Sequence, residues 1–207
     1  MTQTGTIYLD PGFMWLNELE KDDTDTEPDH RSAYGLDLQF VIPWRYVKEN
    51  EVVSVQPDEA PRSIEDMKYP VAALLYHELA HANDFFPFSR QDSLDPTVPI
   101  GATIGGATAS SRLSSQFSLA SDLMRELAAV SFHGNTADAS QRQILPVNVE
   151  AEFSTDYASD YYNYSSQGED LAMAFEEAMM LFSFGVDRDI AITSMPATKA
   201  CGDFIVT

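Results

Sequence analysis

Two stretches of the chain carry apolar residues at the spacing of an α-helix. In residues 117–132 they recur every three or four positions, which places them on one face of a helix. These positions are Leu119, Leu123, Leu127 and Val130. Residues 169–184 are also rich in apolar and small side chains and are followed by Gly185, a common helix stop. The pattern predicts helices over 117–132 and 169–184.

A third apolar run lies near the middle of the chain and begins at Pro70. Proline is tolerated in the first turn of a helix, where its missing N–H breaks no hydrogen bond. The segment 63–66, Ser-Ile-Glu-Asp, lies just upstream and also resembles a helix start. We therefore expect the main helix over about residues 70–84.

Short β-rich runs bounded by proline or turn residues lie toward the two ends of the chain. The predicted strands are 6–10, 36–42, 44–47, 51–55, 189–193 and 204–206. Residues 88–114 are rich in glycine, proline and small side chains, and such a long irregular segment is expected either to line a substrate cleft or to be mobile. We expect one α+β domain over 1–207. It would be sheet-rich over about 1–60 and helical over about 70–84 and 115–185.

Composition and charge limit the classes of binding partner that we expect. The hydrophobic content of 44% is that of a globular protein. The net charge of −21 repels nucleic-acid phosphates and anionic membranes, so neither is an expected partner. No apolar run approaches the roughly 20 residues of a membrane-spanning helix. The first five residues lack the pattern of a signal peptide. The sequence leaves open whether the protein is secreted, periplasmic, at the cell surface or cytoplasmic, and what its oligomeric state is.

The segment His77-Glu78-Leu79-Ala80-His81 within the central run reads H-E-x-x-H. Residues four apart share one face of a helix, so the two imidazoles can bind one metal ion. This spacing suits zinc, with Glu78 as the general base of a hydrolase. The chain has four histidines, so a chance match to this motif is rare.

A zinc site needs a third protein ligand. The extended motif with a third histidine is excluded, because Asp84 and Pro87 occupy the positions of its glycine and histidine. His30 and His133 have no supporting context, so a carboxylate is favoured. The candidates are Glu126, Glu150, Glu152, Asp156, Asp160, Glu169, Glu176 and Glu177.

Glu169 stands out among these candidates because it begins a helix of small and apolar residues that can pack closely on the motif helix. In the alternative interpretation it only caps that helix, in a capping box with Ser166. Glu176 shares its face and is the second candidate, either as a ligand or as a support for one. A carboxylate usually orients a metal-bound imidazole. The candidates for that role are Asp84, Asp156, Asp160 and Asp170.

The H-E-x-x-H motif, followed much later by Tyr162 and the segment Glu169–Phe175, resembles the gluzincin metallopeptidases. The resemblance is to bacterial zinc peptidases of the anthrax lethal factor type. It covers about residues 70–84 and 157–184, and the gap between the two motifs is longer than in that family. It implies a zincin-like fold, in which a small mixed β-sheet packs on the active-site helix beside a further helical part.

The resemblance also implies a set of roles. Zn²⁺ would be held by His77, His81 and Glu169, with Glu78 as catalytic base. Tyr162 would donate to the transition state, although Tyr161 and Tyr164 compete for that role. The expected activity is that of a zinc metallopeptidase acting on a peptide or protein. Two alternatives stay open: a non-catalytic binding or surface protein on a zincin scaffold, and a toxin-like effector protease domain.

Overall fold

The computed structural model describes residues 7–9, 14–20, 30–54, 61–93, 95, 97–98 and 107–196. Its α-helices are α2 (Ile64–Phe85), α4 (Ala109–Gln116), α5 (Asp122–His133), α6 (Pro146–Phe153) and α7 (Gln167–Phe184). Its short 3₁₀ helices are η2 (His30–Ala33), η3 (Phe88–Ser93), η4 (Gln141–Gln143) and η5 (Tyr161–Ser165). Its strands are β1 (Phe40–Val41), β2 (Trp44–Lys48), β3 (Glu51–Val52), β4 (Asp187–Ile190) and β5 (Thr193–Ser194). The predicted α+β class is confirmed.

The strands form two small sheets, one in the order β3-β2-β4 and one pairing β1 with β5. Every pairing among the described residues is antiparallel, so the expectation of a mixed sheet is wrong for this part of the chain. The two residues Glu49 and Asn50, both with positive φ, join β2 to β3, and a connection that short permits only an antiparallel pair. On its other edge β2 pairs with β4, which runs in the opposite direction. In that register Tyr46 lies beside Arg188, and Arg45 lies beside Asp189.

Helix α2 begins earlier than predicted. Ser63 caps it by accepting from the Asp66 N–H at 3.2 Å, and the Asp66 carboxylate accepts from the Ser63 N–H at 2.7 Å. This capping box satisfies two N-terminal donors and stabilises the earlier start. Pro70 therefore lies inside the helix rather than in its first turn.

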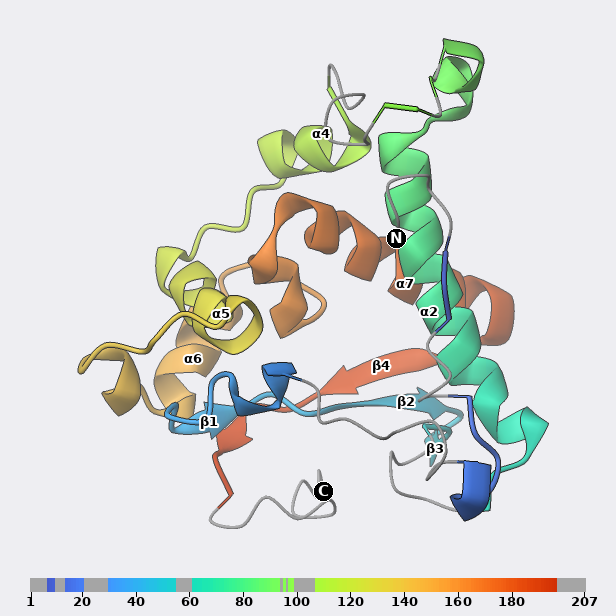
Figure 1. Ribbon diagram of the computed structural model, residues 1–207. Helices are drawn as coiled ribbons and strands as arrows, with labels where there is room; N and C mark the ends of the chain where they lie inside the picture. Colours follow the sequence, from blue (N-terminus) through green and yellow to red (C-terminus); the bar gives the residue numbers. More distant parts are fainter. Residues whose placement is uncertain are drawn as a thin grey trace.

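Helices α2 and α7 pack against each other and against the three-stranded sheet (Figure 1). Their shared core contains Tyr46 of β2, Ala73 of α2, Met180 of α7 and Val186. Small side chains such as Ala73 and Ala172 are buried on the two helices, which allows their backbones to approach closely. This packing brings the start of α7 to the middle of α2.

A second core joins α5, α6, η5 and β1, on the side of the molecule away from α2 (Figure 1). Its fully buried side chains include Met124 and Leu127 of α5 and Val149 of α6. Helix α5 begins at Asp122 rather than at residue 117, because Ser121 caps it by accepting from the Met124 N–H. Helix α4 occupies part of the stretch predicted to be irregular.

The strand predictions are correct in part. The runs 44–47, 51–55 and 189–193 correspond to β2, β3, β4 and the start of β5, with shifted bounds. Residues 7–9 form no strand, and of 36–42 only Phe40 and Val41 pair. Residue pattern alone does not fix short strands, because strand formation depends on available partners. The predicted strand 204–206 lies outside the described residues. None of the described helices combines the length and apolarity needed to cross a membrane.

Candidate metal centre

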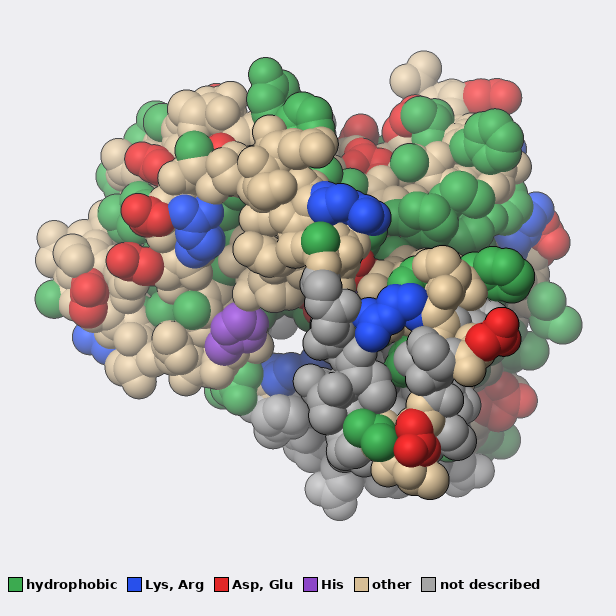
Figure 2. All heavy atoms as spheres, turned by 90° about the horizontal axis from the view of Figure 1, so that it is seen from above, with side chains coloured by type: hydrophobic (Ala, Val, Ile, Leu, Met, Phe, Trp, Pro, Cys, Tyr) green, Lys and Arg blue, Asp and Glu red, His purple; other side chains and the backbone are tan. Residues whose placement is uncertain are grey.

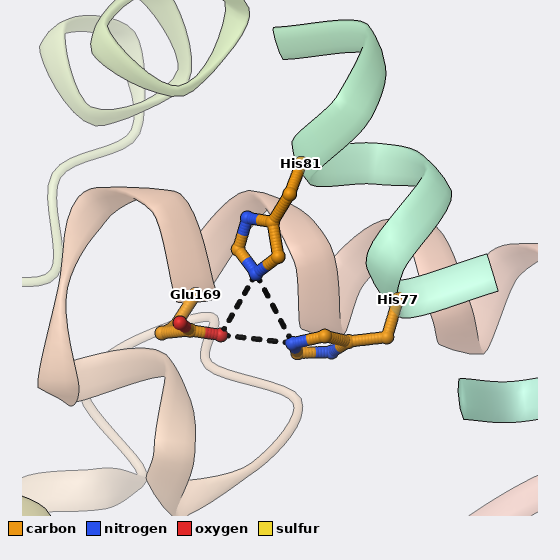
Figure 3. A group of neighbouring side chains, drawn as sticks. All are labelled: His77, His81 and Glu169. Atoms are coloured by element: carbon orange, nitrogen blue, oxygen red, sulfur yellow. Dashed lines mark hydrogen bonds and ion pairs between the residues drawn. The ribbon is translucent and has the colours of Figure 1, made fainter. Parts of the chain in front are cut away.

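Three side chains from two helices converge on one point (Figure 3). His77 and His81 come from successive turns of α2, and Glu169 comes from the first turn of α7. The Glu169 Oε2 atom lies 2.9 Å from His77 Nε2 and 3.2 Å from His81 Nε2. The two Nε2 atoms lie 3.2 Å apart. The group could hold a metal ion, as the sequence predicts.

The spacing of these donors suits a small divalent cation. Three donors bound to one zinc ion at about 2.0–2.1 Å in a tetrahedral arrangement lie about 3.3 Å from one another. The three observed separations of 2.9, 3.2 and 3.2 Å are close to that value. The donor set therefore fits the ion without rearrangement of either helix.

The surroundings of the His77 ring also favour a cation between the three side chains. Its Nδ1 atom lies 3.3 Å from Glu176 Oε2, and a carboxylate there makes Nδ1 the protonated nitrogen of the neutral ring. The Nε2 atom then presents a lone pair to the carboxylate oxygen of Glu169. Two acceptors this close repel each other unless a cation or a proton lies between them.

The same electrostatics appear in the pKa values. Burial lowers the pKa of His77, but Glu169 and Glu176 outweigh it and raise that pKa to about 9. Burial raises the pKa of Glu169, but hydrogen bonds to His77 and His81 outweigh it and lower the value to about 2. The cluster thus stabilises positive charge at the point where the three side chains meet.

Of the capping box predicted as the alternative role of Glu169, only the hydrogen bond to Ser166 forms. The Ser166 hydroxyl accepts from the Glu169 N–H at 3.1 Å and caps α7. The Glu169 carboxylate, however, is turned toward the two histidines instead of back to the cap (Figure 3). Capping by Ser166 therefore positions the backbone of Glu169, and its side chain remains available as a ligand.

A cavity of about 270 Å³ adjoins the three side chains. Its lining consists of His77, Glu78, His81, Phe85, Tyr162 and Glu169. The predicted base and the predicted transition-state donor thus both face the cavity beside the metal ligands. The cavity gives a water molecule and a substrate group room to approach the ligand atoms.

The three competing tyrosines have different surroundings. The Tyr162 ring stacks on His77 with centroids 6.2 Å apart. Tyr161 instead packs on Phe40 in the second core, and its hydroxyl lies 3.2 Å from Ser131 Oγ. Tyr164 is 3% exposed and donates to Asp156 at 2.9 Å. Of these residues, Tyr162 is the one that lines the cavity.

None of the four aspartates considered as imidazole partners takes that role. Asp84 accepts from the backbone N–H and the hydroxyl of Ser110, which anchors α4 to α2. Asp156 accepts from Tyr164, Asp160 from Arg188, and Asp170 from Asn163. The imidazole partner is Glu176, the second candidate from the sequence, which supports His77 rather than joining the ligands. His133 ends α5 and does not belong to the cluster.

Sequence reasoning missed three residues around the centre. Phe85 stacks on His81, with centroids 5.9 Å apart and ring planes 8° from parallel. Tyr46 and Arg188, on neighbouring strands, both contact Glu176. Phe85 lies four residues after His81 on α2, so helical spacing was a signal for their contact. The sequence contains no signal for the contacts of Tyr46 and Arg188 with Glu176, because they depend on the packing of elements distant along the chain.

The chain matches no known protein-family model, no curated protein and no solved structure. The interpretation of the site therefore depends on its own geometry and chemistry. On the face shown in Figure 2, Asp and Glu side chains lie scattered among other residues rather than in one patch.

Proposed function

We propose that the protein is a zinc-dependent metallopeptidase of the gluzincin type, with a zincin-like arrangement of sheet and active-site helix. The observation that carries the proposal is the convergence of His77, His81 and Glu169 beside a cavity that Glu78 also lines. Two imidazoles and one carboxylate form the ligand set of catalytic zinc in several peptidases. A bound zinc ion lowers the pKa of a water molecule and polarises a carbonyl group.

Glu78 is suited to proton transfer. It follows His77 directly on α2 and faces the same cavity, while the ligand positions belong to His77, His81 and Glu169. Its carboxylate can accept a proton from the attacking water and pass it to the departing amine. Such a positioned acid–base group contributes about 10²–10⁴-fold to a rate.

Tyr162 is suited to stabilising the oxyanion that develops on the scissile carbonyl. Burial, and next the charge of Glu169, raises the pKa of its phenol above the ordinary value. The phenol is therefore protonated at neutral pH and can donate a hydrogen bond as charge develops. Its position beside His77 places this donor next to the ligands.

The cavity also bears on the alternative functions. A purely structural zinc site is closed by four protein ligands, whereas a catalytic site keeps room for water. Here three ligand atoms converge next to a cavity lined by an acid–base group and a phenol. This arrangement favours a peptidase over a non-catalytic binding protein. A toxin-like effector would differ in delivery and partner rather than in this chemistry.

Substitution of Glu78 by glutamine tests the proposal. We expect wild-type protein to bind one zinc per chain and to cleave members of a mixed peptide library, with products identified by mass spectrometry. Glu78→Gln should retain the zinc and lose at least about 100-fold in cleavage rate, because the amide cannot accept the proton. Glu65→Gln, on the exposed start of the same helix, is the matched control and should cleave normally. Undiminished cleavage by zinc-loaded Glu78→Gln would refute the proposed role.

A further inference from the structure

A buried arginine lies behind the metal centre, on the sheet. The side chain of Arg188 on β4 is 4% exposed. Its guanidinium lies over the ring of Trp44, 4.6 Å from the centroid. A cation so deeply buried needs anionic partners, and the two that it contacts lead to two different residues of the proposed active site.

The first partner is Glu176. Arg188 Nη2 and the Tyr46 hydroxyl both donate to Glu176 Oε1. The other oxygen of the same carboxylate, Oε2, lies 3.3 Å from His77 Nδ1. The orientation of the Glu176 carboxylate, and through it that of the His77 ring, is thus fixed from the sheet.

The second partner is Asp160. Arg188 Nη1 donates to Asp160 Oδ2 at 2.8 Å. The other oxygen, Oδ1, accepts from the backbone N–H of Tyr162 at 2.9 Å and caps η5. The Asp160 N–H in turn donates to the side chain of Asn163 at 2.9 Å, which closes the turn. The position of the Tyr162 backbone is therefore linked to the same guanidinium.

We propose that Arg188 is a positioning residue that holds both His77 and Tyr162 in place by bridging Glu176 and Asp160. The inference builds on the proposed function, since it assigns a support to a metal ligand and to an oxyanion donor. A guanidinium is suited to the task because its planar fork presents two donors to two carboxylates in fixed directions. A lysine ammonium carries the same charge but lacks that fork.

The same two strands supply a matched control. Arg45 on β2 pairs with Asp189, the neighbour of Arg188, through two hydrogen bonds of 3.2 Å to one carboxylate oxygen. That pair is partly exposed, with side-chain exposures of 33% and 46%. Arg45→Lys therefore changes the same residue type in the same sheet without touching Glu176 or Asp160.

The test measures metal binding by the full-length Arg188→Lys and Arg45→Lys variants. Zinc affinity is measured by competition with a chelator at pH 9, and the visible spectrum of the cobalt-loaded protein reports ligand geometry. We expect Arg188→Lys to bind zinc at least about tenfold more weakly and to show an altered cobalt spectrum, because a misoriented outer partner weakens a metal site by about 10–100-fold. Arg45→Lys should stay within about threefold of wild type, since an exposed pair contributes little.

Hydrogen exchange tests whether Arg188 holds the Tyr162 backbone through Asp160. In Arg188→Lys the amides of residues 160–166 should exchange at least about tenfold faster, while those of α5 keep their wild-type rates. A folded Arg188→Lys protein with wild-type zinc affinity, cobalt spectrum and exchange would overturn the inference. If the wild-type chain binds neither metal, the proposed function fails, and the exchange rates of residues 160–166 still decide whether Arg188 positions Tyr162.

A milder variant covers the case in which Arg188→Lys does not fold. Tyr46→Phe removes one donor to Glu176 and one acceptor of Arg188 Nη2 without changing any charge, and the ring keeps its place in the core. We expect a loss of about threefold or more in zinc affinity and a smaller change of the cobalt spectrum in the same direction. Wild-type values for both quantities in folded Tyr46→Phe would contradict the inference.

Discussion

The two histidines of the motif lie one helical turn apart, yet they are held by different means. His77 is held by charge: its Nδ1 atom faces the buried carboxylate of Glu176, which Arg188 and Tyr46 fix from the sheet. His81 is held by packing: its ring stacks on Phe85, and the backbone of Gly168 approaches it from α7. Two histidines of one helix are therefore held beside the same proposed ion by different supports: a charged one from α7 and the sheet, and an apolar one from α2 and α7.

The carboxylate support of His77 and the aromatic support of His81 should respond differently to substitution and to pH. A buried carboxylate network fixes both the direction and the basicity of an imidazole, and it also attracts protons. An aromatic stack restricts the ring plane but supplies no ionic partner. The charged side should therefore control metal affinity and its pH dependence, whereas the packed side should chiefly control local stability.

The largest expected effect is on pH dependence. Glu169 and Glu176 together raise the pKa of His77 to about 9, so below that pH a proton competes with zinc for this residue. The apparent zinc affinity should rise about tenfold per pH unit well below pH 9, or about 50-fold from pH 7 to pH 9, and level off above. Chelator competition across this range measures it. In Glu176→Gln the levelling should move to lower pH. A constant affinity between pH 7 and pH 9 would contradict the charged role of the His77 side.

The next effect contrasts the two supports directly. Measured at pH 9, Glu176→Gln should weaken zinc binding by about 10–100-fold, because it removes the carboxylate that orients His77. Phe85→Leu keeps apolar bulk beside His81 and should change zinc affinity by less than about fivefold. It should instead lower the unfolding free energy by about 1 kcal/mol through the lost ring contact. If the two variants lose equal zinc affinity, the comparison fails.

The smallest effect concerns the space around His81. A Cβ added at Gly168 would lie 3.6 Å from Ser166 Oγ and 3.7 Å from His81 Cε1, which are ordinary van der Waals separations. Gly168→Ala should therefore leave zinc affinity unchanged within about twofold. Thermal unfolding should show a gain of about 0.5 kcal/mol, because alanine loses less backbone entropy in a helix. A tenfold loss of zinc affinity would show that the packing there is tighter than these distances indicate.

Local patterns in the sequence placed the two histidines together and favoured Glu169 as the third ligand, with Glu176 still open as an alternative. The four-residue spacing fixes His77 and His81 on one face of a helix, and the small residues after Glu169 favour close packing of α7. Both features act within one or two turns, so they can be recognised from sequence alone. The Ser63 capping box is also visible in the sequence as a helix start, but the predicted helix begins near residue 70, and α2 begins at Ile64.

The parts that could not be predicted depend on contacts between distant segments. The contact of Arg188 with Glu176 requires β4 to pair with β2 beside both helices. The residue pattern of two short strands does not reveal which residues pair across them. The choice of Tyr162 over Tyr161 and Tyr164 depends on η5, a short turn fixed by Asp160. The four aspartates considered as partners of His77 and His81 accept hydrogen bonds from other groups. Their positions in the sequence do not reveal those donors.

X-ray absorption at the zinc edge of the purified chain shows which side chains hold the proposed ion. We expect one zinc per chain with two imidazole ligands and oxygen ligands at about 2.0–2.1 Å. In His81→Ala we expect one imidazole fewer. A zinc environment containing sulfur, or one that is the same in His81→Ala as in wild type, would contradict the claim that His77, His81 and Glu169 hold the ion.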